Sequence, residues 1–185
     1  MIFTEASSMV IEVNLQNLCD TESGDKHSDL NITPETWQQW FQAWGEALIS
    51  FLPPSSNYEL SLRLTGDGEI ESLNAQYRQK AQPTDVLAFA ALEVDFPIPN
   101  DEISGQEPLY LGDIVISIET ANRQAQQQNH SLNLEVAWLA AHGFLHLLGW
   151  DHPDDQTLEE MLQQQETLLK IVGLDAQQDY AVCSN

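Results

Sequence analysis

LNLEVAWLAAHGFLHLLGWDH, residues 132–152, is the stretch of this chain that says most about its fold. Residues 132–148 are apolar on nearly every side, a pattern typical of a central helix that is buried all round. Such a helix carries His142 and His146 on one face, because the two lie four positions apart. Gly149 can end the helix in a left-handed conformation. The chain can then turn back and bring His152 to the other two histidines.

These three histidines predict a metal site. Three protein ligands with one open position are the arrangement of a catalytic zinc, whereas a structural zinc is closed by four. Imidazole nitrogen suits zinc, although nickel, copper and iron also accept three histidines. The chain holds only five histidines, so chance is a poor explanation for three at this spacing. We therefore expect one Zn²⁺ per chain, bound by His142, His146 and His152.

A zinc with an open position lowers the pKa of bound water to about 7 and polarises a carbonyl or phosphoryl oxygen, which predicts hydrolysis or transesterification. The spacing His-x3-His-x5-His is that of the metzincin peptidases, in which a Glu directly after the first His is the general base. This chain has Gly143 at that position, which argues against a peptidase. Glycine inside a helix costs about 1 kcal/mol relative to alanine. We expect a close approach of backbone or substrate there, or simple tolerance where another helix packs.

The composition predicts one domain and no membrane anchor. The chain has 185 residues, 42% of them hydrophobic, which suits a single globular domain. Cys19 and Cys183 make no disulfide framework and favour a reducing cytoplasm. The first eight residues lack the features of a signal peptide, and no segment has the roughly 20 apolar residues that span a bilayer. We expect a disordered extension over 1–9, one metal-dependent hydrolase domain over 10–175 and a tail over 176–185.

The hydrophobic pattern predicts an α+β fold. Alternation and short apolar runs predict strands over residues 10–15, 58–64, 86–91 and 114–118. A 3.6-residue period predicts helices from Thr33 to before Pro53, over residues 70–77 and 119–128, and from Asp154 or Asp155 to Gly173. We expect a mixed, mostly parallel four-stranded sheet packed against helices, with the histidine-bearing helix at the centre.

Two connections and one helix face complete this prediction. Residues 66–68, Gly-Asp-Gly, predict a turn, and the acidic residues 92–110 predict a flexible loop or a loose hairpin. The apolar residues of the last helix predict its inner face, made of Leu158, Met161, Leu162, Leu168, Leu169 and Val172.

The histidine motif and three further segments resemble the YbeY family of bacterial rRNA maturation factors. The further segments are Leu73-Asn74-Ala75-Gln76-Tyr77-Arg78 followed by Thr84-Asp85-Val86-Leu87, then Leu111-Gly112-Asp113-Ile114-Val115-Ile116-Ser117, and finally Glu160-Met161. All four blocks occur in order between about Tyr58 and Gly173. The family usually continues Asp-Val-Leu-Ser-Phe-Pro, and this chain has Ala88 and Ala90 in place of the Ser and the Pro, a change of local loop geometry rather than of chemistry.

The resemblance implies a zinc-dependent, single-strand-specific endoribonuclease that matures the 3′ end of 16S rRNA and serves in ribosome quality control. It implies His142, His146 and His152 as metal ligands and Arg78 as a basic residue beside the metal. A guanidinium can hold two phosphate oxygens at once; a surface Arg in a salt bridge is the alternative. The implied partners are single-stranded rRNA, small-subunit ribosomal proteins and a ribosome-associated GTPase, without a membrane.

Three carboxylates are candidates for positioning the histidines. Asp85, Asp113 and Asp151 each lie beside a predicted strand or ligand and could accept a hydrogen bond from a histidine Nδ1–H, as carboxylates near metals commonly do. Asp85 and Asp113 could equally cap turns. No general base stands out. Either water activated at the metal or the 2′-hydroxyl of the RNA attacks the phosphate, and the second route passes through a cyclic phosphate.

The net charge opposes RNA binding, whose affinity usually comes from Lys and Arg. The chain has 29 acidic and 6 basic residues, giving −23. Either basic ribosomal proteins deliver it to RNA, or a local cleft is positive on an acidic body. Two other functions also stay open: a zinc hydrolase of another class, such as a divergent metallopeptidase, and a non-enzymatic ribosome-assembly factor with a structural metal.

Overall fold

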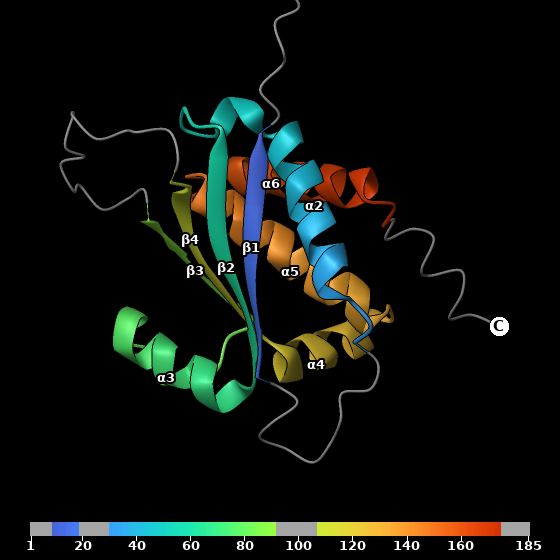
Figure 1. Cartoon of the computed structure of the whole chain (residues 1–185). Coiled ribbons are helices and arrows are strands. Elements are labelled where there is room, and N and C mark those ends of the chain that lie inside the picture. Colours follow the sequence, from blue (N-terminus) through green and yellow to red (C-terminus); the bar gives the residue numbers. More distant parts are fainter. Residues whose placement is uncertain (1–8, 19–29, 92–106, 175–185) are drawn as a thin grey trace, which may run out of the picture.

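The computed structural model describes residues 9–18, 30–91 and 107–174, and a four-stranded sheet forms its middle layer (Figure 1). The strand order is β1-β2-β4-β3. Strands β1 (Val10–Asn17), β2 (Asn57–Thr65) and β4 (Leu109–Ser117) run parallel, and β3 (Val86–Ala90) pairs antiparallel with β4 at the edge. The prediction of a mostly parallel four-stranded sheet is confirmed. The predicted tail and all but Met9 of the predicted extension lie outside the described residues.

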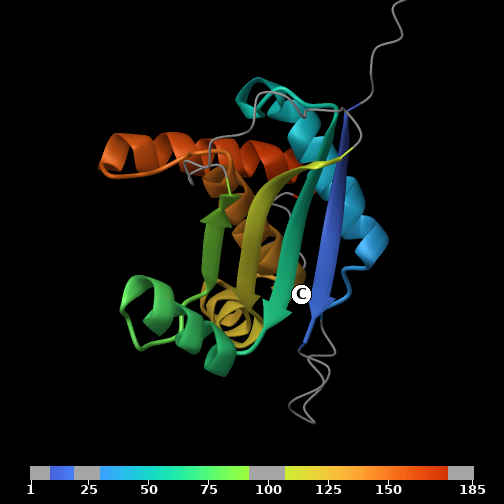
Figure 2. The same ribbon diagram turned by 60° about the vertical axis from the view of Figure 1, so that its left-hand side comes forward.

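Helices cover both faces of this sheet unequally. They are α2 (Pro34–Ala47), α3 (Asp67–Arg78), α4 (Ile118–Gln128), α5 (Leu132–Leu147) and α6 (Asp155–Ile171), with a short 3-10 turn at Ile49–Phe51. Helices α2, α5 and α6 lie on one side of the sheet, and α3 lies on the other (Figures 1 and 2). Over the described part of the chain, no helix combines the length and the apolarity needed to cross a membrane.

Helix α5 lies at the centre of the main hydrophobic core, as its apolar sequence predicts. Phe144 of α5 packs edge-on against Phe41 of α2, with ring centroids 5.3 Å apart. The indole of Trp44 adds a hydrogen bond from Nε1 to the Leu168 carbonyl oxygen of α6, 2.8 Å long. Phe41 and Trp44 are therefore core residues that attach α2 to α5 and to α6.

The predicted helix starts are largely confirmed. The Thr33 side chain accepts from the Thr36 N–H, and Asp154 forms a capping box with Thr157 at the start of α6. The turn predicted at residues 66–68 is wrong, because Gly66 is the N-cap and α3 begins at Asp67. Asp67 accepts hydrogen bonds from Ser117 Oγ and Thr120 Oγ1, each 2.6 Å long. These bonds fasten the start of α3 to the start of α4.

The inner face of α6 differs from the prediction at one position. Leu162 is 39% exposed, whereas Gln165 is fully buried beside Met161 and Leu168. Positions 161, 165 and 168 follow the helical repeat and share one face. Leu162 lies only about 20° round the axis from the buried Leu169, so the packing of neighbouring elements, and not helical phase, leaves Leu162 exposed.

Strand β4 begins five residues earlier than predicted and contains a bulge. Its register against β2 jumps from Glu59–Tyr110 to Leu60–Gly112, so Leu111 is the extra residue. Gly112 has φ +136°, and a Cβ there would lie 2.1 Å from the Phe89 carbonyl oxygen, so the bulge requires glycine. The predicted strand residue Ile118 instead begins α4.

Candidate metal centre

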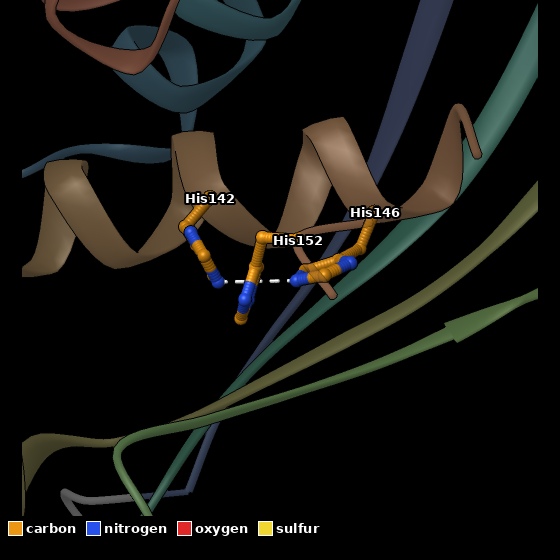
Figure 3. Close-up of side chains that lie close together, drawn as sticks. All are labelled: His142, His146 and His152. Carbon is orange, nitrogen blue, oxygen red and sulfur yellow. Dashed lines mark hydrogen bonds between the residues drawn. The ribbon is translucent and has the colours of Figure 1, made fainter. Parts of the chain in front are cut away.

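Three histidine rings converge at the end of α5 (Figure 3). His142 and His146 come from the helix, and His152 comes from the segment that follows it. Their ligand atoms all lie within 4.8 Å of one another, a grouping that could hold a metal ion. The Nε2 atoms of His142 and His146 are 3.1 Å apart. Zn–N bonds of about 2.0–2.1 Å at a tetrahedral metal put two nitrogens about 3.3–3.4 Å apart, so this donor set fits zinc.

The return of the chain after α5 follows from a helix-ending motif. Gly149 has φ +86°, and the Trp150 N–H donates to the Leu145 carbonyl oxygen over 3.1 Å. The Asp151 carboxylate then accepts from the His152 backbone N–H at 2.8 Å. These two local interactions turn His152 toward the helix that it has just left.

The surroundings of His142 and His146 favour the neutral ring. Burial lowers the pKa of His142, and the neighbouring His152 lowers it further, while a hydrogen bond to Gln165 opposes the change. Burial also lowers the pKa of His146, and His142 adds to this effect. A ring that is neutral at neutral pH keeps a nitrogen lone pair available, which metal binding requires.

A cleft of about 460 Å³ opens beside the rings, and we call it the histidine cleft. It is lined by Arg78, Thr84, Asp85, Val86, Ala88, Ala90, His142, Gly143, His146, Gly149, Trp150, Asp151 and His152. One wall is therefore the edge strand β3 and the other is α5 with its following segment. The structure brings the three predicted ligands, Arg78 and two of the three candidate carboxylates into this one cleft.

Asn74 shapes the segment that carries Arg78 to the cleft. Arg78 is the last residue of α3, and Gln79 follows in the left-handed conformation. The buried Asn74 donates from its side-chain Nδ2 to the Gln82 carbonyl oxygen at 2.8 Å. The backbone carbonyl oxygen of Asn74 accepts from the Lys80 N–H. Sequence reasoning missed Asn74, although an Asn inside a helix is itself a signal because its side chain competes for backbone groups.

The candidate carboxylates contact backbone and amide groups rather than histidine rings. Asp85 Oδ1 accepts from the Val86 N–H at 2.8 Å, and its Oδ2 accepts from Gln124 Nε2 at 3.0 Å. Asp85 therefore has the alternative role expected from the sequence, that of capping a turn. Asp151 binds the His152 backbone and not its ring. In the described part of the chain, neither carboxylate hydrogen-bonds any of the three rings.

Asp113 is not near the histidines, and its selection as a partner for them is corrected. Its Oδ1 accepts from the Tyr110 hydroxyl at 2.7 Å, and it lines a different hollow together with Arg63 and Tyr77. The reason is strand alternation, since its neighbour Ile114 faces Gly143 of α5. Asp113 therefore faces the side of the sheet that carries α3.

The partner that sequence reasoning missed at the histidines is Gln165 of α6. Its Oε1 lies 3.2 Å from His142 Nδ1. The signal was available in the sequence, because Gln165 occupies a position of the helical repeat that otherwise carries core residues.

Comparison with known proteins places these residues in a family. A family model described as Endoribonuclease YbeY matches residues 22–173. The chain belongs to the YbeY endoribonuclease family. A YbeY endoribonuclease of Nostoc sp. is 52% identical over 186 residues, covering 97% of this chain and 100% of the relative. One from Cyanothece sp. is 56% identical over 168 residues, covering 90% and 95%.

The fold is shared with a solved structure. The solution structure of TM1509 from Thermotoga maritima matches with a TM-score of 0.52 and 24% sequence identity, covering 88% of this chain and 89% of that chain. The resemblance to the YbeY family that the four sequence blocks indicate is thus confirmed by the relatives and the family model.

Gly143 gives this YbeY chain a feature that separates it from metzincin peptidases. A Cβ at position 143 would lie 2.8 Å from Ile114 Cγ2 of β4, closer than normal side-chain contacts allow. The close approach that we expected at Gly143 is therefore one of helix to strand. A glutamate there, which a metzincin uses as its base, would force α5 and β4 apart.

In this YbeY chain, the arginine of the histidine cleft differs from other basic residues in its ion pairs. Three of the described cations form ion pairs, namely Arg63 with Glu69, Arg123 with Asp67, and Lys170 with Glu166. Within residues 9–18, 30–91 and 107–174, Arg78 and Lys80 form none. Both stand at the end of α3, and Arg78 lines the histidine cleft, so one of the two unpaired cations of the described residues lies beside the histidines.

Proposed function

We propose that this chain is a zinc-dependent, single-strand-specific endoribonuclease of the cytoplasm. Its role would be maturation of the 3′ end of 16S rRNA and ribosome quality control. One observation carries the proposal: three converging histidine nitrogens share a cleft with an arginine that has no acidic partner among the described residues. Membership of a family named for endoribonuclease activity supports the choice of RNA as substrate.

The histidines and the arginine of the cleft have different roles in this proposal. Bound zinc supplies Lewis-acid polarisation of a phosphoryl oxygen and lowers the pKa of water. His142, His146 and His152 would hold the metal through their ring nitrogens. Arg78 binds non-bridging phosphate oxygens through its guanidinium and stabilises the negative charge that develops on them during cleavage.

The shape of the cleft supports a single-stranded substrate. Its volume of about 460 Å³ accommodates a few groups of one strand and not a duplex. Trp150 on its wall also packs against Phe51, with ring centroids 5.2 Å apart. Unstacked bases of single strands bind readily to such aromatic side chains, whereas bases inside a duplex are stacked on one another.

The acidic surface supports delivery by partners. With a net charge of −23, binding to free RNA relies on few cations. We propose that small-subunit ribosomal proteins and a ribosome-associated GTPase bring the chain to its RNA. Basic ribosomal proteins would be attracted by its acids.

The test is cleavage of a single-stranded RNA by zinc-loaded protein, compared with His142→Ala and Arg78→Ala and with a matched duplex. The expected result is cleavage of the single strand alone by the wild type, lost in His142→Ala and strongly reduced in Arg78→Ala. A 2′,3′-cyclic phosphate end would identify the 2′-hydroxyl as the nucleophile. No cleavage with ribosomal subunits present would overturn the proposal.

Two controls separate the remaining alternatives. Casein cleavage that depends on His146 would favour a metallopeptidase, which the packing at Gly143 opposes. Unfolding on chelation of zinc, with function intact in Arg78→Ala, would favour a non-enzymatic assembly factor with a structural metal.

A further inference from the structure

Gln165 is a fully buried polar residue in the core face of α6. Burying an amide is costly unless its hydrogen-bonding groups are satisfied. Both ends of this amide have partners on α5: Nε2 donates to the Trp138 carbonyl oxygen at 2.8 Å, and Oε1 lies 3.2 Å from His142 Nδ1. The side chain therefore links α6 to the helix that carries two of the histidines.

The contact with Trp138 fixes which way the amide faces. A backbone carbonyl oxygen only accepts hydrogen bonds, so the NH₂ group must lie on its side. The opposite orientation would place two acceptor oxygens against each other at Trp138. Oε1 must consequently face the His142 ring.

The orientation of the amide in turn fixes the tautomer of His142. An amide oxygen only accepts, so the neutral ring must carry its proton on Nδ1. The lone pair then lies on Nε2, the atom 3.1 Å from His146 Nε2 at the point where the three rings meet. His142 is thus prepared to bind through Nε2.

In the described part of the chain, neither His146 nor His152 has such a side-chain partner. Across the described residues, Gln165 is the one non-histidine side chain that hydrogen-bonds any of the three rings. We propose that Gln165 is the positioning residue of the metal centre, holding His142 in the Nδ1–H tautomer with Nε2 directed at the metal. This inference rests on the proposed metal-binding role of His142.

A neutral amide differs from the carboxylates that often fill this role near metals. It directs the ring without adding negative charge beside the ligands. The positive charge of a bound metal would therefore be offset by fewer anions than in a site with a carboxylate partner.

The first test is the tautomer of His142 in the metal-free protein, read from long-range ¹H–¹⁵N correlations of the imidazole rings at pH 8. Gln165→Met keeps the length of the side chain and removes the acceptor. Gln165→Glu keeps an acceptor toward His142 but loses the donor to the Trp138 carbonyl oxygen, and Gln163→Met makes the same change as Gln165→Met on the exposed side of α6. We expect Nδ1–H in the wild type, Gln165→Glu and Gln163→Met, and a mixture or Nε2–H in Gln165→Met. An unchanged tautomer in Gln165→Met would overturn the proposal, and so would Nε2–H in the wild type.

The second test is zinc affinity by competition with a chelator. Loss of a partner of this kind weakens metal binding by about 10–100-fold, and we expect this loss in Gln165→Met but not in Gln163→Met. Affinity within about twofold of wild type in Gln165→Met would refute the positioning role. If Gln165→Met fails to fold, the His142 tautomer in the wild type and in Gln165→Glu still decides whether the proposed role of Gln165 holds. Neither test uses RNA, so both results remain valid even if the protein proves not to be a ribonuclease.

Discussion

The histidine cleft and a second hollow, on the side of the sheet that carries α3, differ in how their polar side chains are used. The second hollow, of about 370 Å³, is called the α3-side hollow and is lined by Gln16, Ser61, Arg63, Leu73, Tyr77, Phe89, Asp113 and Val115. Each contains an arginine and at least one aspartate. In the α3-side hollow, Arg63 binds Glu69 and Gln16, and Asp113 binds Tyr110. In the histidine cleft, Arg78 has no ion pair among the described residues.

An arginine beside an aspartate does not by itself make a reactive site. A polar group whose partners lie inside the protein stabilises the fold, and a group left without them is available to a ligand. Only the histidine cleft adds nitrogen donors at metal-binding spacing.

The largest expected effect comes from a metal ligand. His146→Ala should lower bound zinc well below one per chain and reduce RNA cleavage by at least about 1,000-fold, because Lewis-acid stabilisation of several kcal/mol is lost. Asp113→Asn, in the α3-side hollow, should retain both zinc and cleavage of free RNA by the purified protein. Elemental analysis and a gel assay measure the pair. Equal loss of zinc in both variants would contradict the assignment.

The second largest effect is a difference in kcat/KM between variants of Arg78 and Arg63. Arg78→Ala should lower kcat/KM for single-stranded RNA by about 100-fold, the typical cost of removing one group that stabilises transition-state charge. Arg63→Ala should leave kcat/KM unchanged and cost at most about 1 kcal/mol of stability, since its ion pair with Glu69 is partly exposed. Steady-state kinetics and urea unfolding provide the two readouts. A larger loss of kcat/KM in Arg63→Ala than in Arg78→Ala would contradict the roles assigned to the two arginines.

A pair of glycines tests the packing behind the cleft. Gly143→Ala places a Cβ 2.8 Å from Ile114 Cγ2 and should destabilise the protein by about 1–3 kcal/mol. Gly68→Ala in α3 meets no atom within 4 Å and should be neutral or stabilise by up to about 1 kcal/mol. Thermal unfolding of both variants gives the comparison. A stabilising Gly143→Ala would show that α5 and β4 can separate at little cost.

The pH dependence of the metal-free protein tests the buried histidines. Because the pKa values of His142 and His146 are lowered in the folded state, the unfolded state takes up protons first as the pH falls. Stability should therefore be fully present above about pH 6.5 and decline as the pH falls below it. Urea unfolding at several pH values should show a smaller decline in His142→Gln than in the wild type. The same decline in both would remove His142 as a cause.

The smallest effect concerns salt. If Arg78 and Lys80 are the cations that neutralise phosphates, the affinity for single-stranded RNA should fall with a slope of about −1.4 in log K against log salt. Arg78→Ala should reduce this slope by about 0.7, and Arg63→Ala should not change it. Fluorescence anisotropy measures both. A steep slope that survives Arg78→Ala would place the basic surface elsewhere.

The sequence determined much of the fold and of the candidate site because the relevant signals are local. The apolar run of α5 identifies a central helix, the i, i+4 histidines share its face, and Gly149 marks the turn that returns His152. Caps such as Thr33 and Asp154 act within one helical turn. The four sequence blocks also identified the YbeY family.

Other features depended on contacts between distant residues, which no local pattern shows. Asp113 faces the side of α3 because its neighbour Ile114 packs against Gly143 of α5, a contact between residues distant in the sequence. The packing of α6 against its neighbours decided that Gln165, and not Leu162, is buried. Gln165 meets His142 across 23 positions of sequence. The sequence by itself determined the three nitrogen donors; only the tertiary structure decided which groups orient them and which cation stays free beside them, because both depend on how α3, α5 and α6 pack.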